Sequence, residues 1–223
     1  MSSSGILDLN VRKNVPVTRN WITKRILDYA IATPLFFVSI PFVAVCAVWI
    51  KAVSPGPAFF RQQREGRGGR PITVMKLRTM YPNAELVLLE HLESHPEDKE
   101  GWLRCYKLKH DPRVLPVIGM LLRRYSLDEL PQLWNVLRGD MSLVGPRPLP
   151  HYHLNSFSET FVALRRSVMP GVTGLWQVSA RSDGDLSVQE KEDTYYIRNW
   201  SLWLDFYILL RTVKMLVIPN GAY

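Results

Sequence analysis

Residues 29–50 read YAIATPLFFVSIPFVAVCAVWI, an apolar run that holds no charged residue. A helix that crosses a bilayer needs about 20 such residues. The apolar core of a cleaved signal peptide is shorter, at roughly 7–15 residues. The run therefore predicts a helix embedded in a membrane, and this helix decides how the rest of the fold is placed.

Two prolines are expected to bend this helix. Pro34 and Pro41 lie inside the run, and a proline within a helix removes a backbone donor and clashes with the preceding turn. The Ser39 hydroxyl could bond a freed carbonyl one turn back and lower that cost. We expect the break of the membrane helix at Pro41.

Basic residues flank the run on both sides. They are Arg12, Lys13, Arg19, Lys24 and Arg25 before it, and Lys51, Arg61, Arg64, Arg67 and Arg70 after it. A spanning helix would leave one cluster outside, against the tendency of lysine and arginine to stay on the cytoplasmic side. We therefore predict a re-entrant helix over residues 23–53 that returns to the cytoplasmic side. A proline-kinked single span is the alternative.

The rest of the chain predicts an α+β fold that is mostly helical. Residues 58–62 and 72–78 have the composition of short strands, and the glycines between them indicate a small β-hairpin. Helical spacing predicts several amphipathic or interfacial helices, at residues 83–94, 114–124, 128–137, 155–166, 188–199 and 202–218. Residues 95–99 are expected to form a polar loop, and residues 169–181 an irregular loop that carries function. The domains are then an N-terminal segment (1–22), the re-entrant helix (23–53) and a catalytic domain on the cytoplasmic face (54–223).

The last predicted helix is apolar on almost every side. Ser201, Asp205 and Thr212 share one narrow face of it. Two interpretations fit this pattern equally well: a helix in the protein core, or a helix in the membrane interface with Trp200 and Trp203 as anchors.

The charge of the chain restricts its partners. The 223 residues include 28 lysines and arginines against 20 acidic residues, which gives a net charge of +8. This surplus favours an anionic partner, such as nucleic acid, an anionic membrane or a phosphorylated substrate. Because no nucleic-acid motif is recognised, no nucleic-acid partner is expected. Cys46 and Cys105 predict neither a disulfide framework nor a metal site.

The stretch from Arg123 to Pro131, RRYSLDELP, holds the strongest chemical signal. A structural interpretation explains it by helix capping, either with a capping box of Ser126 and Glu129 or with Asp128 as the N-cap. A functional interpretation uses the same residues. An ionised Asp128 can attack phosphorus, Glu129 can hold Mg²⁺ against a diphosphate, and the arginines can clamp phosphate oxygens.

The chain resembles the bacterial sugar transferase family, the monotopic phosphoglycosyl transferases. The hallmark stretch of that family is similar to SLDELPQLWNVLRGDMSLVGPRP at residues 126–148. The Lys-Phe-Arg-Thr-Met motif of the family appears at residues 76–80 with Leu77 in place of phenylalanine. Residues 170–178 match its Pro-Gly-x-Thr-Gly-x-x-Gln-Val motif, and the family's Ser-Pro pair in the membrane helix is replaced by Ile40-Pro41. The resemblance runs from about Lys24 to the C-terminus.

This resemblance implies a two-step phosphotransferase of the bacterial inner membrane, working on its cytoplasmic face. Asp128 and Glu129 would be the catalytic pair: Asp128 attacks the β-phosphorus of a UDP-sugar and expels UMP, and Glu129 binds Mg²⁺. Undecaprenyl phosphate would then take the sugar phosphate. The residues implied in phosphate or nucleotide binding are Lys76, Arg78, Arg123, Arg147, Gln177 and Arg181.

The resemblance also suggests the setting of the reaction. A hexose-1-phosphate for an exopolysaccharide or capsule repeat unit is expected, with an N-acetylated or diamino sugar as the alternative. The short segment before the apolar run corresponds to the minimal catalytic form of the family. Membrane lipids are expected partners, and the oligomeric state is not predicted. A non-catalytic membrane adaptor for polysaccharide assembly is the competing interpretation from a different functional class.

Overall fold

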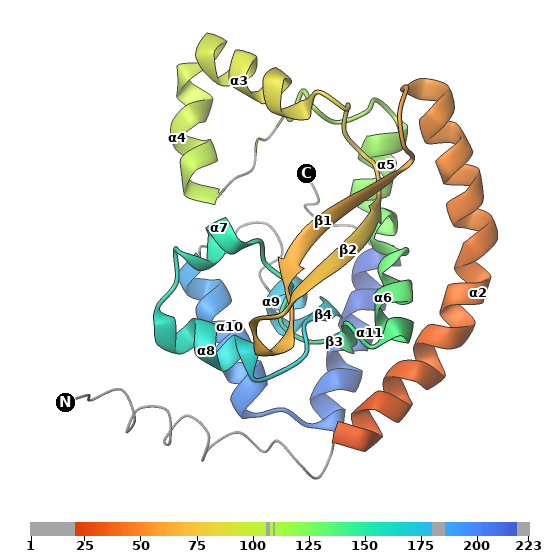
Figure 1. Ribbon diagram of the computed structural model, residues 1–223, viewed down its shortest axis with the longest axis vertical. Helices are drawn as coiled ribbons and strands as arrows, with labels where there is room; N and C mark the ends of the chain where they lie inside the picture. Colours follow the sequence, from red (N-terminus) through yellow and green to blue (C-terminus); the bar gives the residue numbers. More distant parts are fainter. Residues whose placement is uncertain (1–20, 106–107, 109, 180–185, 218–223) are drawn as a thin grey trace.

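The computed structural model describes residues 21–105, 108, 110–179 and 186–217. This part of the chain is mostly helical and contains two small sheets of two strands each, so the predicted α+β class is confirmed. Figure 1 shows the long helix α2 along one side of a body built from shorter helices around a β-hairpin. The helix pair α3 and α4 lies at one end of that body.

Helix α2 (Trp21–Val53) contains the apolar run and continues through both prolines. It bows along its length without a break at Pro41 (Figure 1). The Ser39 hydroxyl donates to the Phe36 carbonyl at 2.8 Å. Proline at position 41 frees the carbonyl four residues earlier, at Phe37, so Ser39 bonds the neighbouring carbonyl instead. The re-entrant arrangement stays a prediction.

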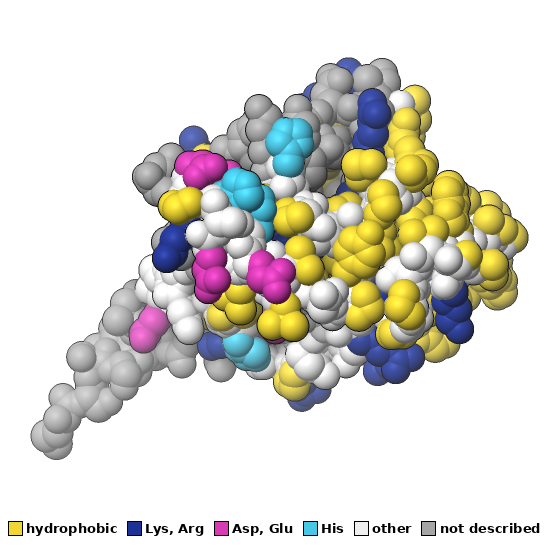
Figure 2. Space-filling view, turned by 90° about the horizontal axis from the view of Figure 1, so that it is seen from above, with side chains coloured by type: hydrophobic (Ala, Val, Ile, Leu, Met, Phe, Trp, Pro, Cys, Tyr) yellow, Lys and Arg dark blue, Asp and Glu magenta, His cyan; other side chains and the backbone are white. Residues whose placement is uncertain are grey.

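Most of α2 is exposed although it is strongly apolar. Among the described residues, it is the helix that is long and apolar enough to cross a membrane by length and composition, and only 11% of its apolar window is buried. Figure 2 shows apolar side chains gathered over one side of the molecule, with lysines and arginines along the border. An apolar surface of this extent indicates association with a membrane.

The N-terminal end of α2 is fixed to the body by buried polar contacts. The Lys24 ammonium lies 2.7 Å from the Asp205 carboxylate, and both side chains are almost fully buried. The Asp28 carboxylate accepts from the Leu143 amide and the Ser142 hydroxyl, each at 3.0 Å. Counting Lys24 as a basic flank at the membrane surface was therefore wrong, because its charge is committed to a carboxylate inside the protein.

The predicted hairpin is confirmed with shifted ends. Strands β1 (Phe59–Glu65) and β2 (Pro71–Leu77) pair antiparallel, with Phe60 opposite Lys76. A short 3₁₀ turn, η1 (Arg67–Gly69), joins them. Gly68 and Gly69 have φ angles of 69° and 76°, a region in which glycine carries no steric penalty.

A helical pair follows the hairpin. Helix α3 (Ala84–Ser94) agrees with the prediction, but α4 (Pro96–Cys105) occupies the stretch expected to be a polar loop. Pro96 opens this helix, and Glu97 and Asp98 lie in its first turn. Proline at the first helical position and acids near the N-terminus both favour a helix start, so the polar composition was misinterpreted.

The middle of the chain forms short elements around the hairpin. They are α5 (Ile118–Arg124), η2 (Leu127–Glu129), α6 (Gln132–Arg138), β3 (Ser142–Val144), α7 (His151–Leu154) and α8 (Glu159–Arg166). The predicted helix at 155–166 begins only at Glu159, because Ser158 is its N-cap and accepts from the Phe161 amide.

The stretch at 169–181 is more regular than predicted. It contains β4 (Gly171–Thr173), which pairs parallel with β3, and α9 (Leu175–Ser179). Gly145 and Gly171 let the two strand ends approach closely: a Cβ on Gly171 would lie 2.1 Å from the Gly145 nitrogen. These glycines serve backbone packing rather than a turn.

Two helices complete the described chain. Helix α10 (Leu186–Arg198) and helix α11 (Leu202–Val217) lie close to their predicted ranges. Asp205 and Ile208 of α11 are buried, whereas Trp203 is 84% exposed. One side of this helix therefore docks on the body, and the Trp200 indole nitrogen donates to Asp205 at 3.0 Å instead of facing outward as an anchor. The placement of the exposed side in the membrane interface stays a prediction.

Candidate active site

The acidic pair lies in the turn between α5 and α6. Asp128 and Glu129 belong to the 3₁₀ turn η2, and the regular helix begins only after Pro131. Ser126 has a left-handed backbone with φ 53° and makes no side-chain cap. Both predicted capping arrangements are therefore wrong, and helix capping does not account for the two carboxylates.

Asn135 docks α6 against the hairpin and so places the acidic turn beside strand β2. Its side-chain nitrogen donates to the Thr73 carbonyl at 2.8 Å, and its side-chain oxygen accepts from the Met75 amide at 3.4 Å. The amide thus bonds the edge of β2 as a neighbouring strand would, and it is only 2% exposed. A buried amide with both ends satisfied fixes this geometry.

Glu129 is clamped between two cations from different elements. Its Oε1 lies 2.5 Å from the Lys76 ammonium and 2.7 Å from Nη2 of Arg147. Burial alone would raise the pKa of Glu129, but Arg147 and Lys76 together hold that pKa well below its ordinary value. Glu129 is therefore a permanently ionised carboxylate at neutral pH.

Asp128 has a different environment from its neighbour. Within the described ranges, its carboxylate takes part in no hydrogen bond or ion pair. Burial raises the pKa of Asp128 from 3.8 to about 6, and the charge of Glu129 acts in the same direction against the nearby cations. The site thus holds one tied and one free carboxylate, and the free one is still mostly ionised at pH 7.

Arg123 lies in the last turn of α5, shortly before the acidic turn. Its Nε donates to the Thr79 hydroxyl at 3.0 Å, and its Nη1 lies 3.8 Å from the Asp111 carboxylate. Its charge lowers the pKa of Asp128, which places it within electrostatic reach of that carboxylate. Lys76, Arg123 and Arg147 therefore all act electrostatically on Asp128, and their part in phosphate binding stays a prediction.

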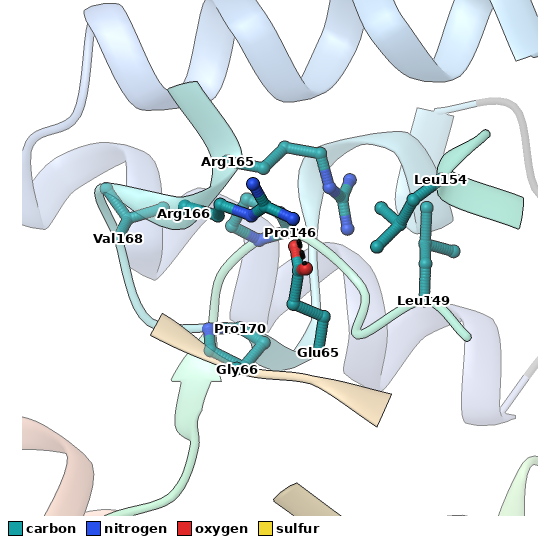
Figure 3. Close-up of a pocket in the computed structure, with 9 residues that line it drawn as sticks. All are labelled: Glu65, Gly66, Pro146, Leu149, Leu154, Arg165, Arg166, Val168 and Pro170. Carbon is teal, nitrogen blue, oxygen red and sulfur yellow. Dashed lines mark hydrogen bonds and ion pairs between the residues drawn. The ribbon is translucent and has the colours of Figure 1, made fainter. Parts of the chain in front are cut away.

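Arg147 is held from behind through its backbone. The Arg165 guanidinium donates to the Arg147 carbonyl and pairs with the buried Asp193 carboxylate. Figure 3 shows Arg165 and Pro146 lining a small pocket beside the Glu65–Arg166 ion pair. That pocket has room for about one water molecule, so it supports the loop of Arg147 and is not the substrate site.

Two of the predicted site residues, Arg78 and Gln177, have hydrogen-bond partners away from the acidic pair. The Arg78 guanidinium is buried against Ser54, whose hydroxyl and carbonyl accept from it at 3.0 and 2.8 Å. Gln177 donates to the Val172 carbonyl at 3.2 Å, while its buried Oε1 has no partner in the described part of the chain. Arg181 lies outside the described residues. Their roles stay predictions.

The sequence patterns missed the residues that support the site without belonging to it. Asn135, Arg165 and Asp193 are polar, buried and distant from one another along the chain, and no local pattern marks them. Arg64 was counted as a basic flank, although alternation along β1 places it on the same face of the hairpin as Lys76. Knowledge of the strand register would have found it.

The unequal environments of the two carboxylates predict unequal titration. In substrate-free protein without divalent cations, Asp128 should titrate near pH 6, while Glu129 stays ionised below the pH at which an ordinary glutamate protonates. Infrared difference spectra against Asp128→Asn and Glu129→Gln assign the two carboxyl signals. A titration of Asp128 near 3.8 would show that burial does not control this group.

The sequence is similar to several known proteins. A family model described as bacterial sugar transferase matches residues 19–219. The undecaprenyl-phosphate galactose phosphotransferase of Salmonella typhimurium is 38% identical over 99% of this chain, which spans 46% of that relative. The exopolysaccharide production protein ExoY of Sinorhizobium fredii is 39% identical, with 91% of this chain and 88% of the relative covered. The UDP-glucose:undecaprenyl-phosphate glucose-1-phosphate transferase of Caulobacter vibrioides is 40% identical, with 99% and 79% covered. The chain spans about half the length of the first of these relatives.

Proposed function

The chain belongs to the bacterial sugar transferase family, and on that premise we propose that it transfers a hexose-1-phosphate from a UDP-sugar to undecaprenyl phosphate. The observation that carries this proposal is the acidic pair itself, with Asp128 free and Glu129 clamped by Lys76 and Arg147. The names of two relatives, a galactose phosphotransferase and a glucose-1-phosphate transferase that both specify undecaprenyl phosphate, support the class of substrate. The product would begin the repeat unit of an exopolysaccharide or capsule.

In the first step, a carboxylate oxygen of Asp128 attacks the β-phosphorus of the UDP-sugar. The bond from this oxygen to phosphorus forms, and the bond from phosphorus to the bridging oxygen breaks. UMP leaves with that oxygen and its negative charge, so no proton needs to move. Lys76, Arg123 and Arg147 are positioned to offset the negative charge on the phosphates.

In the second step, an oxygen of undecaprenyl phosphate attacks the phosphorus of the aspartyl phospho-sugar. The bond to Asp128 breaks and returns the free carboxylate, and the product is a polyprenyl diphosphate sugar. Direct transfer from a soluble donor to a lipid acceptor is difficult. Two successive displacements at the Asp128 carboxylate replace it with two easier steps.

We include Mg²⁺ in the proposal, with Glu129 as its protein ligand. Magnesium is bound in such sites by one or two carboxylates together with substrate phosphate oxygens. Glu129 fits this role because it stays ionised and faces the cations that would also meet the phosphates. When bound, the ion would neutralise charge on the diphosphate. The described residues contain no group of three or more histidine, cysteine, aspartate or glutamate side chains for an all-protein metal site.

A position at the membrane surface gives the protein access to both the soluble donor and the lipid acceptor. The exposed apolar residues of α2 and α11 would lie in the lipid, which brings a lipid-bound acceptor to the body that carries the acidic pair. We propose the cytoplasmic face of the bacterial inner membrane as the location, because nucleotide sugars are soluble substrates.

UMP release tests the proposal. Purified protein in detergent, given Mg²⁺, undecaprenyl phosphate and a panel of UDP-hexoses and UDP-N-acetylhexosamines, should release UMP from at least one donor. Removal of divalent cations by a chelator should stop the release, and added Mg²⁺ should restore it. Absence of UMP with every donor would reject the enzyme and favour a non-catalytic membrane adaptor.

A further inference from the structure

Arg64 occupies a place in the hairpin that the proposed chemistry does not use. It pairs with Ile72 across the sheet, and Phe60 pairs with Lys76. Because side chains alternate along a strand, Arg64 and Lys76 project from the same face of the hairpin. That face also carries the buried Ile72 and Val74, so it is turned toward the body of the protein.

The Arg64 guanidinium has only uncharged hydrogen-bond partners. It donates to the Pro148 carbonyl at 3.3 Å and to the side-chain oxygen of Gln62 at 2.5 Å. No carboxylate pairs with it among the described residues. The contact with Pro148 places it on the loop that carries Arg147, whose own guanidinium binds Glu129 at 2.7 Å. Of the two guanidinium groups, only that of Arg147 holds a carboxylate of the described ranges, and that of Arg64 lies against the same loop without one.

The positive charge of Arg64 is not balanced by a carboxylate of the described residues in this arrangement. A partly buried cation without a carboxylate costs free energy, and a second cation nearby increases the cost. The pKa of Arg64 reflects this: burial and then Arg147 lower it to about 10, and Tyr152 and Glu129 only partly oppose them. An anion bound between the two arginines would remove the conflict. The planar guanidinium matches the paired oxygens of a phosphoryl group.

We propose that Arg64 and Arg147 together form a phosphate subsite next to the acidic pair. The inference rests on the proposed function and adds a residue to its substrate contacts. The anion is a phosphoryl group of one of the two substrates, either the diphosphate of the nucleotide sugar or the monophosphate of the lipid acceptor. Arg147 then connects this subsite to Glu129, while the substrate phosphoryl group would be the anionic partner of Arg64, whose partners in the structure are uncharged.

The test compares Arg64→Met and Arg64→Lys with Arg61→Met. Arg61 is a matched control because it lies on the same strand with an exposed side chain, and alternation turns it to the opposite face. The donor arm measures UMP release in a single turnover without acceptor. The acceptor arm measures transfer from the preformed phospho-sugar protein to undecaprenyl phosphate.

Either the donor arm or the acceptor arm should show that Arg64→Met has lost a charge-assisted hydrogen bond to the substrate phosphate. Arg64→Met should raise the half-saturating concentration of one substrate by about 10- to 100-fold, Arg64→Lys should retain part of the binding, and Arg61→Met should match the wild type. An effect in the donor arm assigns the diphosphate, and an effect in the acceptor arm assigns the lipid phosphate. Arg64→Met that equals Arg61→Met in both arms would overturn the proposal.

A binding measurement separates this inference from the catalytic proposal. Inorganic pyrophosphate should raise the unfolding temperature of wild-type and Arg61→Met protein, and should do so less for Arg64→Met. If the wild type releases no UMP but this difference is present, the catalytic proposal fails and the subsite stands. If pyrophosphate stabilises Arg64→Met as much as the wild type, the subsite is rejected.

Discussion

Replacement of Asp128 by asparagine should reduce UMP release by on the order of 10⁴-fold or more, the scale seen when a covalent nucleophile is removed. The amide keeps the size and shape of the side chain but has no negative charge with which to attack phosphorus. Glu129 cannot take over, because Lys76 and Arg147 already hold its carboxylate. The measurement is the single-turnover release of UMP from the donor sugar selected in the screen.

The same variant should fold at least as stably as the wild type. Folding raises the pKa of Asp128, so the folded state binds a proton more tightly than the unfolded state. The contribution of this group to stability therefore falls as the pH rises from about 4 to about 6, and at pH 7 the ionised carboxylate opposes folding. Asp128→Asn removes that opposition. An unchanged or higher melting temperature would show that the lost activity is chemical.

Two further results would complete this experiment. Radioactive sugar phosphate from the donor should become attached to wild-type protein and to Asp98→Asn, an acid on α4 that pairs with His91, but not to Asp128→Asn. Residual activity of Asp128→Asn above about one per cent, without deamidation, would indicate direct transfer between the substrates and would reject the covalent step.

The sequence predicted the features that local patterns encode. The apolar run predicted α2, and the glycines between two β-rich segments predicted the hairpin. The motif resemblance pointed to Asp128, Glu129, Lys76, Arg123 and Arg147, which interact with one another in the structure, while their catalytic roles stay predictions. Each of these depends on neighbours in sequence or on a long contiguous motif.

The features that were missed depend on contacts between distant segments. The strands β3 and β4 have three residues each, too few for a visible alternation, and they exist because Gly145 and Gly171 allow close backbone approach. Arg64 looked like one more basic flank until the strand register placed it beside the loop of Arg147. Composition alone cannot separate a lysine that faces lipid head groups from one that is buried with a carboxylate.

Lys24 is the clearest case of that ambiguity, and its replacement by methionine should cost about 3–5 kcal/mol of folding stability. The substitution leaves Asp205, which is 1% exposed, as a buried carboxylate without a cation. The Tyr196 hydroxyl at 2.8 Å and the Trp200 indole nitrogen at 3.0 Å still donate to Asp205, but neutral donors do not replace the charge. For a domain of this size, such a loss corresponds to a fall in melting temperature of roughly 10 °C.

Lys51→Met is the matched control, because Lys51 lies at the other end of the same helix and is exposed. A lysine that only faced the membrane surface would behave like Lys51, whose loss should change stability by no more than about 0.5 kcal/mol. The double variant Lys24→Met/Asp205→Asn should recover much of the stability lost in Lys24→Met, because it no longer buries an unpaired charge. Melting temperatures in lipid nanodiscs measure all three variants. Equal melting for Lys24→Met and Lys51→Met would mean that α2 is held on the catalytic body by apolar contacts alone, and that the buried ion pair does not fix the membrane helix to it.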